Sequence, residues 1–301
     1  MPPQFPEFRE LSLADRELFE KAAGPRPRAA CEYSFANLVI WRDFDRPMVT
    51  SINDNLCVLL RPPVGDPFFL EPLGSNEILE TVKACIMHAG KVSRVSPLLA
   101  ESLGGNGYGT RPIPEHFDYL FSTSELAEFK GRRFDGKRNH IKRLQEKYPR
   151  MEYAALSRDD SAAALLLFDE WQKFREARGP VFGALPALAY SCQRASVARL
   201  FESFDELEIL GGKLLVDGDM AGFIAGSASG PDVACVHFCY SRPGFPGAFP
   251  LMLKKACGTT FSPFELVNLE QDLGLEGLRK NKLSFHPVRL EEKFEISRGR
   301  P

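Results

Sequence analysis

Apolar residues recur with two different periods along the first half of the chain. A helical spacing of about 3.6 residues is found at 12–23 and again at 78–88. Between and after these segments lie short apolar runs typical of strands, at 48–52, 56–61, 68–71, 91–96 and 117–123. The sequence Asn53-Asp54-Asn55 tolerates positive φ and predicts a hairpin between the first two runs. The first half is therefore predicted to form a small sheet with helices.

The second half changes period in a definite order. Two amphipathic helices are predicted at 161–178 and 187–204, and four short strands follow at 207–210, 213–216, 220–229 and 233–240. Asp217-Gly218 is typical of a type I′ hairpin turn. The chain then continues with a loop, a helix, a strand, a helix and a strand, at 242–247, 248–257, 264–269, 275–283 and 288–296.

This order of elements resembles that of the GNAT acyltransferase fold. The expected fold class is α/β (α+β), with two tandem GNAT-like domains, each a mixed, mainly antiparallel central sheet flanked by helices. We expect a degenerate N-terminal domain over residues 1–125. We expect a C-terminal domain over residues 126–301, which starts with a basic helix at 135–148.

Composition limits the class of protein. The 301 residues are 44% apolar and 26% charged, which is typical of globular domains. No apolar run approaches the ~20 residues of a membrane helix, and residues 1–10 lack a signal-peptide pattern, so a cytoplasmic protein without a transmembrane segment is expected. The seven cysteines are scattered and are expected to be reduced. A net charge of −2 gives no global attraction to nucleic acid, so such a partner needs a local patch.

Two segments are candidates for phosphate binding. The loop 242–247 lies between a strand and a helix, where backbone N–H groups can hold a pyrophosphate, with Arg242, Gly244 and Gly247 as candidates. The alternative is a plain tight turn, because Pro246 has no N–H. Residues 130–150 contain nine Lys or Arg and two acids, and Asp135 is placed to cap a helix there. The cations of this helix could bind polyphosphate or tRNA, or could simply be solvated. The candidates for phosphate binding are Lys137, Arg138, Lys142 and Arg143.

Two further groups of residues suggest chemistry. Cys235, His237 and Cys239 alternate along one strand and should face the same way, as metal ligands or, as we favour, as core residues; no metal is predicted. Glu270 and Asp272 follow a strand that leads to the open part of a GNAT-like sheet. They could accept a proton from an attacking amine or cap the next helix.

Three segments resemble one particular family, named after the C-terminal domain of bacterial phosphatidylglycerol lysyltransferase. They are 33–41 (YSFANLVIW), 126–141 with Lys130-Gly131 and Lys137-Arg138-Asn139-His140, and 268–287 (NLEQDLGLEGLRKNKLSFHP). The chain is similar to a short, stand-alone, soluble member. The resemblance implies tandem GNAT-like domains related to the Fem aminoacyltransferases, which take an amino acid from aminoacyl-tRNA.

The resulting hypothesis is an acyl- or aminoacyltransferase without a covalent enzyme intermediate. The donor would be acyl-CoA or aminoacyl-tRNA, no cofactor would be tightly bound, and the acceptor would be the amine or hydroxyl of a small molecule or peptide. Backbone N–H groups near His237 would stabilise the oxyanion, and Glu270 or Asp272 would guide the amine proton. Two alternatives stay open: a non-catalytic module that binds a phosphate-bearing ligand, and a metal-dependent enzyme that uses Cys235, His237 and Cys239.

Overall fold

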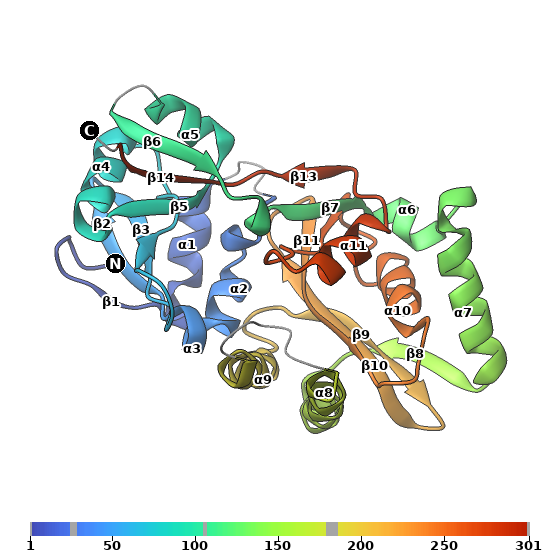
Figure 1. The fold of residues 1–301 in the computed structure, drawn as a ribbon. Coiled ribbons are helices and arrows are strands. Elements are labelled where there is room, and N and C mark those ends of the chain that lie inside the picture. Colours follow the sequence, from blue (N-terminus) through green and yellow to red (C-terminus); the bar gives the residue numbers. More distant parts are fainter. Residues whose placement is uncertain (1, 25–28, 105–106, 179–185, 300–301) are drawn as a thin grey trace. The chain divides into compact units, whose positions relative to one another are not determined.

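A computed structural model describes residues 2–24, 29–104, 107–178 and 186–299, which form two compact units. The first unit comprises Met1–Asp118, Gln271–Gly274 and Leu290–Pro301, and the second comprises Tyr119–Glu270 and Leu275–Arg289. Each unit has its own seven-stranded sheet (Figure 1). The first unit is thus assembled from three separate stretches of chain.

The first unit contains five helices and seven strands among its described residues. The helices are α1 (Arg16–Ala23), α2 (Phe35–Ile40), α3 (Arg42–Asp45), α4 (Ile78–Ala89) and α5 (Pro97–Leu103). The strands are β1 (Arg9–Glu10), β2 (Met48–Ile52), β3 (Asn55–Leu60), β4 (Phe68–Phe69), β5 (Lys91–Val95), β6 (Tyr108–Pro112) and β14 (Phe294–Arg298). Their order in the sheet is β1-β2-β3-β4-β5-β14-β6.

The first sheet is mainly antiparallel, and its one parallel pair joins β4 to β5, with Phe69 opposite Val92. Cys57 and Leu59 of β3 pack with Cys85 and Ile86 of α4 in one apolar cluster. Because side chains alternate along a strand, Val58 faces the other side, where it lines a small cavity together with Phe19 of α1. Helices therefore cover both faces of this sheet.

The second unit has the longer strands. Its helices are α6 (Thr123–Glu128), α7 (Asp135–Lys147), α8 (Ser161–Glu176), α9 (Pro186–Glu202), α10 (Ala248–Cys257) and α11 (Glu276–Leu283). The strands of the second sheet are β7 (Asp118–Ser122), β8 (Met151–Ala155), β9 (Leu210–Val216), β10 (Asp219–Ala228), β11 (Val233–Ser241), β12 (Leu266–Asn268) and β13 (Arg289–Glu291). Their order is β13-β7-β12-β11-β10-β9-β8.

Helices also cover both faces of the second sheet. Leu251 and Met252 of α10 pack with Ile224 and Val236 in the main apolar cluster of this unit, which also includes residues of α6 and α7. On the opposite face, the ring of Phe168 in α8 contacts that of Tyr240 with centroids 5.2 Å apart. α10 and α8 thus enclose the central strands β10 and β11 between them (Figure 1).

The expected fold class is confirmed. Both units show the same succession of a strand, helices, an antiparallel meander, a helix, a parallel strand and a further helix, which is the tandem GNAT-like arrangement. Three expectations about strands differ. The single strand predicted at 288–296 is two strands, β13 and β14, which belong to different sheets. The strands predicted at 207–210 and 213–216 are one strand, β9, and the strand predicted at 117–123 in the first half is β7 of the second sheet. Asp135 is the first residue of α7 and not its cap, because the capping position is taken by Phe134.

Candidate functional site

The central strands of the second sheet separate at one point. β11 and β12 pair in parallel from Val233 to Cys235, opposite Leu266 to Asn268. β12 ends at Asn268, whereas β11 continues to Ser241. Beyond Cys235 the edge of β11 that faced β12 is therefore no longer paired with it. An edge of this kind can bind another group through backbone N–H groups.

A β-bulge occurs at the same point. Ala225 of β10 pairs with Phe238 and the next residue, Gly226, pairs with Val236, so His237 is an extra residue in β11. A bulge of this kind re-aims the side chain and interrupts the alternation of the strand. Cys239 accordingly packs against the apolar cluster that includes Val236. The expectation that Cys235, His237 and Cys239 face the same way is therefore wrong for Cys239.

The bulged histidine contacts one of the predicted carboxylates. His237 Nδ1 lies 2.9 Å from Glu270 Oε1, and the Cys235 thiol lies 3.3 Å from the same oxygen. The imidazole is fully buried, while the Glu270 side chain is 17% exposed. Asp272 lies in the first unit, where its buried carboxylate accepts a hydrogen bond from the N–H of Gly274 at 2.8 Å. The structure thus brings together His237 and Glu270 but not Asp272.

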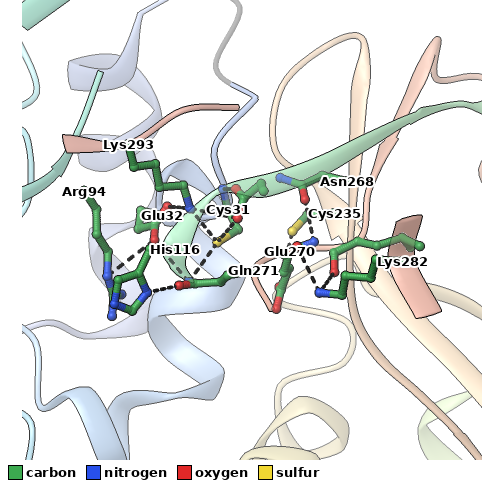
Figure 2. A network of polar contacts seen from close by, with 12 residues as sticks. Cys31, Glu32, Arg94, His116, Cys235, Asn268, Glu270, Gln271, Lys282 and Lys293 are labelled. Atoms are coloured by element: carbon green, nitrogen blue, oxygen red, sulfur yellow. Dashed lines mark hydrogen bonds and ion pairs between the residues drawn. The ribbon is translucent and has the colours of Figure 1, made fainter. Parts of the chain in front are cut away.

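The backbone of Glu270 is held in an unusual conformation. Its φ of +59° lies in the left-handed region, which costs energy in a residue with a Cβ. Three contacts hold it there: its N–H donates to Asn268 Oδ1, and its carbonyl accepts from Lys282 Nζ at 2.9 Å and from the N–H of Tyr119 at 3.3 Å. Figure 2 shows Asn268 and Lys282 on either side of Glu270. The strain indicates that the position of this carboxylate is closely specified.

Lys282 and Asn268 are residues that the sequence reasoning did not single out. Lys282 is only 8% exposed although it belongs to the largely polar helix α11, and its ammonium also donates to the carbonyl of Leu269 at 2.6 Å. A lysine in a polar helix normally points to solvent. The only sequence signal for both residues is that they lie in the segment 268–287.

The two predicted phosphate-binding segments pack against each other. Gly247 caps α10 with a φ of +100°, and a Cβ added to it would lie 2.5 Å from the carbonyl oxygen of His140 in α7. Close by, the rings of Tyr148 and Phe245 stack with centroids 4.8 Å apart. The loop 242–247 and the basic helix α7 therefore form one continuous part of the second unit.

Most of the predicted cations already have partners within the chain. Arg242 forms an ion pair with Glu170 at 3.0 Å. Lys137 donates to Ser284 Oγ at 2.6 Å, and burial lowers the pKa of its ammonium. Arg138 donates to the carbonyl oxygens of Phe129 and Gly131.

The remaining two candidates, Lys142 and Arg143, are exposed on α7. Within the described part of the chain, the ion pair of Lys142 is a long, solvent-exposed contact of 3.8 Å with Glu146. Exposed pairs of this kind contribute little and are readily exchanged for another anion. Lys142 and Arg143 are consequently the cations best placed to bind a ligand.

The contact between Gly247 and α7 gives a first prediction. Gly247→Ala should lower the free energy of unfolding by more than about 2 kcal/mol, because alanine is strained at positive φ and its methyl group would meet the His140 carbonyl. Gly244→Ala is the matched control, since Gly244 also has a positive φ, +87°, but open space around it, and should cost about 1 kcal/mol. Urea denaturation of the two variants measures the difference. Equal losses of stability in the two variants would contradict the close packing of Gly247 against α7.

The first unit contains a separate cluster of buried charges. The Lys293 ammonium lies 2.5 Å from Glu32 Oε2 and 2.8 Å from Asp118 Oδ1, and the three side chains are at most 5% exposed. Gln271 donates to Glu32 at 3.2 Å, and Arg94 lies 3.6 Å from it. Figure 2 shows Glu32, Arg94, Gln271 and Lys293 converging in this way. Such a cluster is stable only when its charges balance.

Two groups of side chains in the described part of the chain have the composition of a metal site. The first group consists of Cys31, Glu32 and Asp118, and the Lys293 ammonium already supplies positive charge to its two carboxylates. In Cys235, His237 and Glu270, the thiol and the imidazole are both within hydrogen-bond distance of the same carboxylate oxygen. In each group every carboxylate therefore already has a partner from the chain itself.

Among the described helices, none combines the length and the apolar character required to cross a bilayer. No match is found among curated protein sequences.

Solved structures similar to this chain extend over nearly its whole length. A conserved protein of unknown function from Bacteroides thetaiotaomicron is 26% identical, with a TM-score of 0.86 over 96% of this chain and 98% of that one. A C-terminal domain (DUF2156) from Agrobacterium fabrum is 16% identical, with a TM-score of 0.63 over 95% and 93%. L-PGS from Bacillus licheniformis is 12% identical, with a TM-score of 0.63 over 99% and 93%.

The family model described as "Phosphatidylglycerol lysyltransferase, C-terminal" matches residues 25–296, a range that includes the strand separation, the glycine loop and the basic helix α7. The chain therefore belongs to the phosphatidylglycerol lysyltransferase C-terminal family.

Proposed function

We propose that the chain transfers an acyl or aminoacyl group from a phosphate-bearing carrier to an amine or hydroxyl acceptor. The observation that supports this most is the course of β11. Starting at the His237–Glu270 pair, the chain reaches Gly247 of the loop backed by α7 within ten residues. A donor with its phosphates on the loop would extend its acyl end along β11 toward His237. The donor would be acyl-CoA or aminoacyl-tRNA.

The transfer would be direct. N–H groups of β11 beyond Cys235 would donate to the carbonyl oxygen of the donor, where negative charge develops. The acceptor nitrogen or oxygen would form a bond with the acyl carbon, and the bond from that carbon to the carrier's sulfur or ribose oxygen would break. Glu270, whose side chain reaches solvent, would take the acceptor's proton and pass it to the departing group.

Donor binding is tested by thermal shift with acetyl-CoA and with aminoacyl-tRNA as separate probes. A ligand present at 100 times its Kd stabilises the folded protein by about 2.7 kcal/mol, which is readily measured. The double variant Lys142→Glu/Arg143→Glu reverses the two exposed cations of α7. The control Lys21→Glu/Lys255→Glu makes the same change of charge on α1 and near the end of α10.

We expect the α7 variant to abolish the shift with aminoacyl-tRNA and the control to retain it. Loss of two phosphate contacts should also reduce the salt dependence, the slope of log Kd against log salt, by about 2. A shift with acetyl-CoA that survives the α7 reversal would assign the donor to the loop 242–247. No shift with either probe would contradict both donors.

A non-catalytic binding module is the second candidate, and two features of the loop favour it. Arg242 is already paired with Glu170, and Pro246 offers no N–H to a phosphate. This candidate predicts that a probe binds and is recovered unchanged. Measuring deacylation of the bound donor in the presence of a panel of primary amines separates the two candidates.

A further inference from the structure

Ser227 of β10 contacts the other nitrogen of the His237 ring. Its hydroxyl oxygen lies 2.8 Å from His237 Nε2, and the residue is only 2% exposed. Ser227 pairs with Cys235 across the two strands, which places its side chain on the same face as the bulged histidine. With Glu270 at Nδ1, the buried imidazole therefore has a polar partner on each of its nitrogens.

For a neutral imidazole, the chemistry of these partners selects one tautomer. An ionised carboxylate only accepts hydrogen bonds, so Nδ1 bears the proton that is donated to Glu270. Nε2 then presents a lone pair, and the Ser227 hydroxyl donates to it. The hydrogen bonds thus run in one direction, from Ser227 through His237 to Glu270. Of these three residues, Glu270 is the one whose side chain reaches solvent.

The bulge makes this second contact important. A residue inserted into a strand is not held by the regular ladder, so the orientation of its side chain depends on its own contacts. Glu270 alone would fix only one of the two ring nitrogens. Contacts at both nitrogens define the ring plane as well as the tautomer.

We propose that Ser227 is a positioning residue of the candidate site. It holds the bulged His237 as the Nδ1–H tautomer, and this directs one hydrogen bond at Glu270 and keeps that carboxylate in place. The importance of Ser227 for transfer rests on the proposed function. The tautomer of the His237 ring does not rest on it, and this tautomer can be measured without any donor or acceptor.

The same order of residues, serine, histidine and acid, occurs in hydrolases whose serine is a nucleophile. In this chain the serine is a residue of β10 that is only 2% exposed, which disfavours attack on an acyl carbon. We therefore assign the positioning role. Treatment with a serine-directed phosphonofluoridate provides a direct test of this assignment, because a nucleophilic Ser227 would be covalently labelled and a positioning Ser227 would not.

The main experiment records two-bond ¹H–¹⁵N correlation spectra of the histidine rings at pH 8. The chain has five histidines, and His237→Gln identifies the signals of this one. We expect a protonated Nδ1 and an unprotonated Nε2 that accepts a hydrogen bond. Ser227→Ala should raise the fraction of the Nε2–H tautomer about fivefold, equivalent to a hydrogen bond of about 1 kcal/mol. Ser227→Thr, which keeps the hydroxyl, should restore the original spectrum.

Ser262→Ala is the control, because that hydroxyl donates to the carbonyl of Thr259 and not to the ring. A protonated Nε2 in the unaltered protein would overturn the proposal, and this measurement needs no variant that might fail to fold. An unchanged ring spectrum in Ser227→Ala, or labelling of Ser227 by the phosphonofluoridate, would also overturn it. Each of these results is independent of whether the protein proves to transfer an acyl group.

Discussion

Lys293→Ala is expected to destabilise the first unit by about 3–5 kcal/mol, the cost of removing one partner from a buried ion pair. The Lys293 side chain is 1% exposed, and its ammonium lies between the carboxylates of Glu32 and Asp118. Burial alone would lower the pKa of this ammonium, but the neighbouring acids raise it above its usual value. Without the Lys293 ammonium, the carboxylates of Glu32 and Asp118 would stay buried without enough positive charge nearby to balance them.

The measurement is urea denaturation followed by tryptophan fluorescence in a Trp171→Phe background. The chain has two tryptophans, and Trp41 then reports on the first unit alone. Lys83→Ala is the matched control: its ammonium lies 2.6 Å from Glu80, but both side chains reach solvent, so the loss of stability should be much smaller than in Lys293→Ala. Similar losses in the two variants would contradict the argument from burial.

The cost of Lys293→Ala should also depend on pH. Burial raises the pKa of Glu32, but Lys293 and Arg94 lower it below its usual value of 4.5, so this carboxylate stabilises the folded protein above that pH. In the unaltered protein that contribution is lost as pH falls through the lowered pKa. In the variant the carboxylates can protonate at a higher pH and so cease to be unpaired charges. The difference in stability should therefore shrink between about pH 7 and pH 4.

Glu270→Gln should lower kcat about 10²- to 10⁴-fold with whichever donor supports transfer, which is the usual contribution of a positioned proton acceptor. Glutamine is similar in shape and can still accept from His237, but its amide oxygen does not take a proton at neutral pH. Donor affinity should be unchanged, because the phosphates would bind at α7 and the loop 242–247.

The assay measures release of the carrier under saturating donor, together with the donor's thermal shift. Glu265→Gln is the control, since Glu265 is an exposed carboxylate that precedes the same strand, β12. Undiminished turnover in Glu270→Gln would rule out this carboxylate as the proton acceptor. A loss of the donor's thermal shift would instead place Glu270 in donor binding.

Local patterns predicted most of the helices and strands of the second unit. The expected turn at Asp217-Gly218 is a clear case, because both residues have positive φ as a type I′ hairpin requires. The end of the chain was harder to predict. The apolar residues at 288, 290, 294 and 296 indicate extended structure. Nothing in the segment specifies that the strand is interrupted, or that β14 inserts between β5 and β6 of the other sheet.

The candidate site was predictable only in part. His237 and Glu270 were identified because a GNAT-like order of elements places them where two strands separate. Their direct contact depends on an extra residue in β11, and a bulge leaves no clear mark on the alternation of apolar residues. Ser227 and Lys282 have ordinary sequence surroundings and become partners of the site only through tertiary packing.

The discontinuous first unit has a consequence for synthesis on the ribosome. Its sheet needs β14 between β5 and β6, so it cannot close until residues 294–298 have left the exit tunnel. The sheet of the second unit is complete at residue 291, where β13 ends. Because domains generally fold as units during synthesis, the part of the chain made later can mature first. A stop codon at any of positions 292–294 would thus remove β14 and damage the sheet that was translated first.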